Sequence, residues 1–416
     1  MTTYRRSGAA AGPQLAAKSA VLLSFVVALE IVIMISPFAL FFYAVFNPFL
    51  LALDRAGATR WLTAFFLPHM IVPPDFLLRA IRVAGSVLFV VGMSAFLLCA
   101  IQVYVGRLWR TGAATKGLYA VIRHPQYVSL AATAIGLAIM WPRFLTLVLL
   151  AVMLFLYYVL AKDEERRMFN RYGDSYGALV DRTGMFLPRR VERLLPGLAP
   201  AGVLPGPGTL VAILCLFLVV TVGSGFALRT YTLRHLPLVS VDGVDVIAIT
   251  EEDVEAMPEI LTSVFQAPKV AERLTRARGG EGHRLLAYVV PIDYTMQGMI
   301  GDTGEEWKLF ERHKTIGMIT EYVFHPFAHL TEGHAHRGTS PVVGMSMHDS
   351  PAMKRRVIFV DISADKPLAV ARDDFGIGVR RLPRFFVDVH LHTGEVLQVK
   401  DIPSGSGWGT VPTPMF

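Results

Sequence analysis

Long runs of apolar residues alternate with short polar stretches through the first half of the chain. An α-helix rises about 1.5 Å per residue, so a run of about 20 apolar residues is long enough to cross the hydrocarbon core of a bilayer. This pattern predicts about five transmembrane helices, at residues 19–46, 80–105, 127–140, 144–161 and 209–228.

Two of these runs are separated only by Trp141-Pro142 and the residue that follows. Because proline cannot continue a helix, the break predicts a tight helical hairpin. Both outer ends of such a hairpin lie at the same membrane face. We therefore expect the corner Arg123-His124-Pro125 to meet the charged segment Lys162-Asp163-Glu164-Glu165-Arg166-Arg167.

Other segments are weaker signals. The apolar run at residues 61–72 is too short to span and ends at Pro73-Pro74, so it fits an interfacial or re-entrant segment. Glu30 is a carboxylate at membrane depth, where it either serves substrate or cofactor or packs two helices in its neutral form. Cys99 and Cys215 both lie in apolar runs and supply neither a disulfide framework nor a cysteine zinc site.

The C-terminal part has a different pattern. After a Pro/Gly-rich linker at residues 197–207 and the last apolar run, charged and apolar residues mix in short blocks. Residues 251–278 have helical character, with an acidic start and a basic end. Runs rich in β-branched residues predict strands at residues 285–290, 342–345, 357–362, 385–391 and 396–399.

The sequence therefore predicts an α-helical integral membrane bundle followed by a soluble α+β domain. We expect a cytosolic tail at residues 1–18, a membrane domain at 19–196, the linker, a fifth transmembrane helix at 208–228 and the soluble domain at 229–416. The first run follows Arg5, Arg6 and Lys18 without a cleavage pattern, which favours an uncleaved helix.

Charge fixes the expected orientation. The 416 residues carry a net charge of +7 and are 53% hydrophobic, too apolar for an ordinary soluble enzyme. The basic residues flank apolar runs instead of forming the aromatic-rich polar patch of a nucleic-acid binder. By the positive-inside rule the hairpin ends face the cytosol, so the soluble domain is extracytoplasmic, as in a protein of a bacterial inner membrane.

Histidines are dense in one part of the predicted soluble domain. His325 and His329, then His334 and His336, have spacings that suit a pair of metal ligands, and neutral imidazole suits zinc, copper or nickel. No carboxylate is fixed among them by spacing, so hydrogen-bonding loop histidines are the competing interpretation. His390 and His392 alternate on a predicted strand.

The order of polar residues around the hairpin is the most specific signal. Arg123-His124-Pro125-Gln126-Tyr127, the apolar hairpin, Glu164-Glu165, Tyr172-Gly173-Asp174-Ser175-Tyr176 and Phe186-Leu187-Pro188 follow one another in that order. This set resembles the isoprenylcysteine carboxyl methyltransferase family and its phospholipid methyltransferase relatives, over about residues 117–190. The sequence departs from the family pattern at Ser129, where glycine is frequent, and at Val180, where an aromatic residue is expected.

The resemblance implies S-adenosylmethionine bound at the cytosolic mouth of the helix bundle, and a lipophilic or small methyl acceptor that enters from the bilayer. It implies that His124 and Glu164 or Glu165 hold the cofactor. We further expect Pro125, Tyr127, Arg167, Tyr172 and Tyr176 at the cofactor, and Arg123 and Glu165 in catalytic roles. Taken singly, Arg123, Lys162, Arg166 and Arg167 also fit basic residues that reach from helix ends to the membrane interface.

Two other functions stay open from sequence. Membrane sterol and isoprenoid reductases, which use NADPH, resemble this layout, but their corner usually has Asn where Gln126 stands here. A non-catalytic membrane anchor for an exported binding domain is the second alternative. The acceptor also stays open among carboxylate, amine and thiol.

Overall fold

The computed structural model describes residues 36–68, 75–109, 116–194, 203–277, 284–292, 294, 297–301, 303, 353–363 and 371–405. By contacts the chain divides into two units. The first comprises Met1–Phe41, Gly85–Leu137 and Val148–Thr221, and the second comprises Phe42–Ala84, Ala138–Leu147 and Val222–Phe416. Glu30, His325, His329, His334, His336 and the predicted strand at 342–345 lie outside the described residues.

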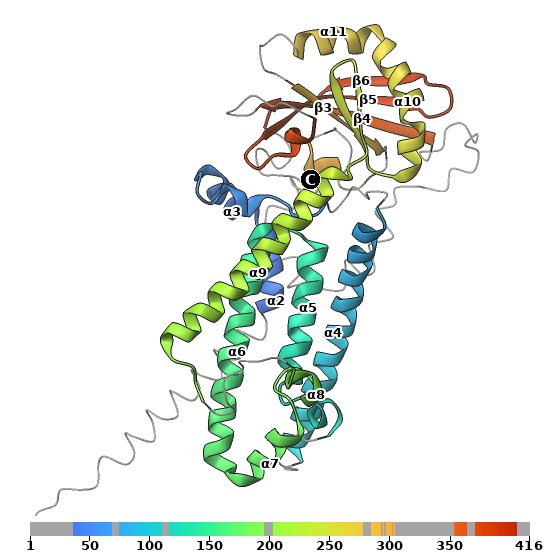
Figure 1. Ribbon diagram of the computed structural model, residues 1–416. Helices are drawn as coiled ribbons and strands as arrows, with labels where there is room; N and C mark the ends of the chain where they lie inside the picture. Colours follow the sequence, from blue (N-terminus) through green and yellow to red (C-terminus); the bar gives the residue numbers. More distant parts are fainter. Residues whose placement is uncertain are drawn as a thin grey trace, which may run out of the picture. The chain divides into compact units, whose positions relative to one another are not determined.

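Helices make up the N-terminal half of the described chain (Figure 1). Three of them, at Phe76–Gly106, Phe144–Tyr172 and Pro207–Arg234, are long and apolar enough to cross a membrane, and a bent helix pair raises the number to four. The described residues thus support a membrane protein, while the predicted total of five is not confirmed. The helices are α2 (Ser36–Val45), α3 (Asn47–Arg55), α4 (Phe76–Leu108), α5 (Pro125–Met140), α6 (Phe144–Tyr172), α7 (Asp174–Arg182), α8 (Arg189–Glu192) and α9 (Pro207–Arg234).

The predicted hairpin is confirmed: α5 ends at Met140 and α6 begins at Phe144. At only 16 residues, α5 is shorter than the three long helices. Helix α4 packs closely on α5 within the first unit, because a side chain at Gly136 would approach the carbonyl oxygen of Gly85 to 2.6 Å. Small residues allow such close packing of apolar helices in a bilayer.

Residues 60–67 pack on the turn of this hairpin in the second unit. After a short 3₁₀ helix, η1 (Arg60–Thr63), the chain is extended, and Phe65 pairs with Arg143 through an isolated β-bridge. The backbone nitrogen of Phe66 donates to Pro142 O at 2.7 Å, and that of Phe144 donates to Ala64 O at 3.0 Å. The segment predicted to be interfacial or re-entrant therefore begins in the 3₁₀ helix and continues as an extended stretch that packs on the turn of the hairpin.

Helix α9 continues to Arg234, beyond the end at residue 228 that the sequence predicts. The sequence places the end of the span before Arg229 because a charged residue is expected outside the bilayer. In the structure the Arg229 side chain is buried and donates to the backbone oxygens of Phe65 and Phe375, both in the same unit. Carbonyl groups thus satisfy the guanidinium and allow the helix to continue through it.

A six-stranded sheet with sequential strand order forms the C-terminal part (Figure 1). Only the pair β2–β3 is parallel, and its crossover consists of two helices, α10 (Glu251–Gln266) and α11 (Pro268–Ala277). The remaining neighbours are antiparallel. The strands are β1 (Leu238–Val241), β2 (Val244–Ala248), β3 (Arg284–Pro291), β4 (Lys354–Ser363), β5 (Arg380–His390) and β6 (Val396–Asp401).

Each face of the sheet has its own apolar core. Residues of α10 and α11 such as Leu261 and Val270 pack with Val246 on one face, and Leu236, Phe375 and Ile402 pack on the other. The α+β character of this part is confirmed, as are the predicted strands at 285–290, 357–362, 385–391 and 396–399, within a residue or a few at each end. The helical segment 251–278 is two helices, which meet at Ala267 before Pro268.

Candidate active site

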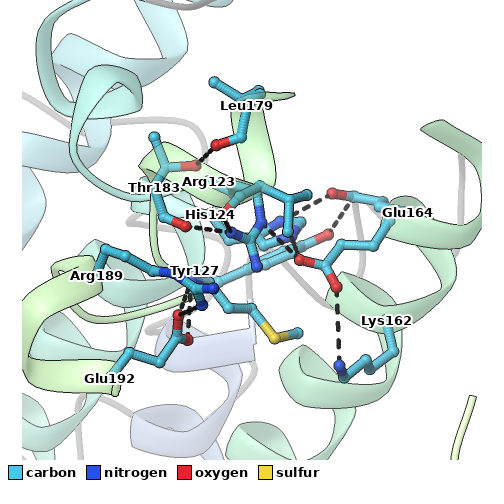
Figure 2. A network of polar contacts seen from close by, with 12 residues as sticks. Arg123, His124, Tyr127, Lys162, Glu164, Leu179, Thr183, Arg189 and Glu192 are labelled. Carbon is cyan, nitrogen blue, oxygen red and sulfur yellow. Dashed lines mark hydrogen bonds and ion pairs between the residues drawn. The ribbon is translucent and has the colours of Figure 1, made fainter. Parts of the chain in front are cut away.

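Backbone pairing brings the Arg123-His124 corner to the segment that follows α7 (Figure 2). The amide of Arg123 donates to Gly184 O at 2.8 Å, and that of His124 donates to Met185 O at 3.1 Å. The Met185 amide in turn donates to both carboxylate oxygens of Glu192, at 2.9 and 3.1 Å. The corner is therefore held by main-chain bonds before any side chain is considered.

A buried ion pair joins the corner to the end of α6. Arg123 Nε donates to Glu165 Oε1 at 2.7 Å, and the side chains are 5% and 0% exposed. Arg123 Nη1 also donates to the backbone oxygen of Thr183, and Lys162 Nζ lies 3.7 Å from Glu165 Oε2. Arg123 and Lys162 are thus buried and do not reach out to the membrane interface.

Glu164 binds two side chains from the first turn of α5. Tyr127 Oη donates to Glu164 Oε1 at 2.6 Å, and His124 Nδ1 lies 3.3 Å from Glu164 Oε2. The rings of His124 and Tyr127 stack with centroids 5.7 Å apart, and Tyr127 stacks in turn on Tyr157 at 5.1 Å. The Glu164 side chain remains 34% exposed, so it is open to a ligand.

The remaining predicted residues differ in position. Pro125 begins α5 and is buried, which suits the first position of a helix. Arg167 is exposed and pairs with Asp163 at 3.2 Å, and Tyr172 is exposed at the end of α6. Tyr176 is buried against Phe169, and this burial, with the negative charge of Glu165 adding to it, raises the pKa of its hydroxyl to about 12.

The structure therefore brings together Arg123, His124, Tyr127, Glu164 and Glu165, as the hairpin argument expects. Sequence reasoning missed Glu192 as the carboxylate that supports this corner, and it missed the buried position of Lys162. No pattern of residue spacing marks Glu192 in the sequence, because its partner is a backbone amide and not a side chain. Arg189 lies 3.7 Å from Glu192 on the other side of that carboxylate.

The donor set fits a cationic ligand of the kind that the resemblance implies. Glu164 offers a partly exposed carboxylate, and the partly exposed Phe186 offers an aromatic ring, and both attract cations. His124 Nε2 and Glu165 Oε2 are buried and make no hydrogen bond among the described residues. Such open polar atoms are costly unless a ligand or water uses them.

Metal ligation is a separate question. No group of three or more His, Cys, Asp or Glu residues that could hold a metal occurs in the described part of the chain. His390 Nδ1 accepts from the Thr393 amide at 3.3 Å, so one histidine of that predicted strand has a structural partner. Binding of a metal by His325, His329, His334 and His336 stays a prediction.

Comparison with known proteins supports the resemblance. Residues 80–175 match the family model described as Phospholipid methyltransferase, a segment that runs from α4 through both helices of the hairpin to Ser175. No curated protein and no solved structure matches the chain. The resemblance to phospholipid methyltransferases that the sequence predicts is confirmed for this segment, and it suggests a membrane methyltransferase.

Proposed function

We propose that the hairpin corner binds S-adenosylmethionine and that the chain transfers its methyl group to a lipophilic or small acceptor at the cytosolic membrane face. The observation that carries the proposal is the meeting of His124, Tyr127 and Glu164 at the end of the family-matched hairpin, with one carboxylate partly exposed. The cofactor, when bound, supplies a methyl group on a positively charged sulfur.

The protein groups divide into two roles. In this proposal Glu164, Tyr127 and Arg167 contact the cofactor, and His124 lies beside them on Glu164. The carboxylate attracts the ammonium or ribose hydroxyls of the cofactor, and the arginine attracts its carboxylate. Arg123 bonds to Glu165 and to the backbone oxygen of Thr183, so this pair holds the corner in position. Tyr176 packs behind Arg123 and excludes water from the pair.

Cofactor affinity tests this proposal directly. Glu164→Ala removes the carboxylate that accepts from Tyr127 and faces the site, and we expect weaker binding of S-adenosylmethionine by roughly 1.5–3 kcal/mol, the worth of one charge-assisted hydrogen bond. Calorimetry on the purified chain in detergent measures it. Asp181→Ala, at an exposed carboxylate on α7, is the matched control and should bind as the unchanged chain does.

The same titration separates the competing functions. Binding of NADPH in place of S-adenosylmethionine would replace the proposal by a reductase, and binding of neither would favour the anchor function. Replacing Glu165 as well is a poorer test, because it leaves Arg123 buried without its carboxylate and destabilises the fold.

We also infer that the corner faces the cytosol and that the sheet-containing part is extracytoplasmic, in a bacterial inner membrane. The basic residues of the hairpin ends support this orientation. After replacement of Cys99 and Cys215, Ser175→Cys should react with a membrane-impermeant thiol reagent only from the cytosol. Glu272→Cys, at an exposed residue of α11, should react only from outside, and labelling of both from one side would reject the orientation.

A further inference from the structure

One nitrogen of the His124 ring has a protein partner and the other has none. Nδ1 lies 3.3 Å from Glu164 Oε2, whereas Nε2 is buried and makes no hydrogen bond within the described ranges. Glu165 Oε1 lies 3.9 Å from Nε2, beyond hydrogen-bonding distance, and is already bonded to Arg123 Nε.

The partners of Glu164 settle which nitrogen of the neutral ring carries the proton. An ionised carboxylate only accepts hydrogen bonds, and its other oxygen already accepts from Tyr127 at 2.6 Å. The proton between Glu164 and the imidazole therefore belongs to Nδ1. The neutral ring then presents an open lone pair at Nε2.

The ring is also held in one orientation. Tyr127 stacks on the His124 ring. The centroid of the Phe186 ring lies 5.9 Å from that of His124, and the planes of these two rings are inclined by 50°. The backbone amide of His124 donates to Met185 O, which fixes the main chain below the ring. A fixed, buried imidazole with a carboxylate on Nδ1 and an open Nε2 is the arrangement of a general base.

We propose that His124 Nε2 is the catalytic base that removes a proton from the reacting atom of the methyl acceptor, with Glu164 as the residue that positions and orients it. This inference rests on the proposed function. An ammonium or thiol acceptor gives its proton to Nε2 and keeps the electron pair. That pair forms the bond to the methyl carbon, the carbon–sulfur bond breaks, and its electrons stay on sulfur as the neutral thioether.

The proposal also narrows the acceptor chemistry. A carboxylate acceptor is already ionised at neutral pH and needs no base, whereas an ammonium, thiol or hydroxyl has a proton to lose. The open Nε2 therefore favours an acceptor with a proton on the reacting atom. The experiment distinguishes these acceptors by supplying each in turn.

Two variants test the base against a simple cofactor contact. His124→Asn keeps a donor near Glu164 but removes Nε2, and Glu164→Gln can donate to Nδ1 and so move the ring proton to Nε2. For both we expect turnover at saturating S-adenosylmethionine to fall by about 10²–10⁴-fold, the usual contribution of a general base. For His124→Asn the cofactor affinity should change less than about threefold, and added imidazole should restore part of the rate.

The assay uses S-adenosylmethionine with a labelled methyl group and three probes: lipid vesicles with a primary-amine head group, an alkyl thiol and a fatty acid. His235→Asn, at an exposed imidazole bonded to Tyr231 O, is the matched control and should keep the full rate. Thermal unfolding of each variant shows that it is folded.

Three results would overturn the assignment. The first is a turnover that is unchanged in His124→Asn while the cofactor affinity is weaker. This result would indicate that His124 contacts the cofactor and is not a base. The second is methylation of the fatty acid alone, which needs no base. In both cases the proposed function survives, whereas absence of S-adenosylmethionine binding by the unchanged chain would remove the function and the base together.

Discussion

Two buried arginine–carboxylate pairs in this protein differ in how many of their polar atoms form hydrogen bonds. In the sheet, Arg356 binds Asp388 with two parallel bonds of 2.7 and 2.8 Å, donates to Gln297 at 3.1 Å and lies over the Phe386 ring. At the hairpin corner Arg123 makes one bond to Glu165, whose second oxygen has no hydrogen bond among the described residues.

The difference is the one expected between a purely structural pair and a pair at the proposed site. Both pairs are removed from water, so both must be compensated by hydrogen bonds inside the protein. The Arg356 pair obtains this compensation from Asp388, Gln297 and an aromatic face, and thus needs no ligand. In the Arg123 pair, Glu165 Oε2 has Lys162 Nζ at 3.7 Å but makes no hydrogen bond among the described residues, and the same holds for the nearby His124 Nε2.

Breaking the complete pair should have the largest effect on stability. Asp388→Ala leaves the fully buried Arg356 without its carboxylate, and we expect the unfolding free energy to fall by about 3–5 kcal/mol. Denaturant or thermal unfolding of the full chain in detergent measures it. S-adenosylmethionine affinity below the transition should not change.

The control for this change is Asp401→Ala. Asp401 pairs with Arg273 but is 65% exposed, so its loss should matter by less than about 1 kcal/mol. If Asp388→Ala is no more harmful than the control, or if it abolishes cofactor binding in a folded chain, the division between structural and functional pairs is wrong.

Asp374 sharpens the comparison, because it is a polar group of the sheet-containing part that is not fully paired. Its two carboxylate oxygens make no hydrogen bond among the described residues, and the nearest cation is Arg284 Nε at 3.4 Å. Burial raises the pKa of Asp374 to about 7, with the neighbouring Asp245 adding to the rise and Arg284 opposing it. The folded chain therefore prefers the protonated acid.

This preference predicts a pH dependence of stability. A folded pKa above the unfolded value of about 3.9 gives a contribution that is full below about pH 4 and is lost as pH rises through about 7. The slope is at most about 1.4 kcal/mol per pH unit, because one proton is involved. Asp374→Asn should flatten the unfolding free energy between pH 4 and 7, and Glu272→Gln, at an exposed carboxylate, should leave the slope in place.

The sequence predicts some of this organisation well because the signals are local. Pro142 disfavours a continuous helix, so the hairpin and the meeting of Arg123 with Glu165 follow from this residue and the lengths of the two apolar runs. Strands β1 and β2 also had a local signal that was overlooked. Asp242 and Gly243 both have positive φ, and an Asp-Gly pair between alternating valines predicts a tight hairpin turn.

Other features depend on contacts between distant residues. Arg229 is helical only because the carbonyl groups of Phe65 and Phe375 accept its bonds, and neither lies near it in sequence. Glu192 supports the active-site corner through a backbone amide, which has no side-chain signature. Distinguishing Glu164 from Glu165 also needed the structure, since adjacent helical residues point in directions about 100° apart.

The smallest predicted effect concerns the hydroxyl of Tyr127. Tyr127→Phe keeps the stacking on His124 and Tyr157 but removes the 2.6 Å bond to Glu164. Because Glu164 is partly exposed, water can replace the lost donor, and we expect the unfolding free energy to fall by only about 1 kcal/mol. Tyr104→Phe, at an exposed residue of α4, should show no change. A loss of unfolding free energy above about 3 kcal/mol would mean that Tyr127 stabilises the fold about as much as Asp388 does. The corner would then be a structural element like the Arg356–Asp388 pair, and not a site kept open for a ligand.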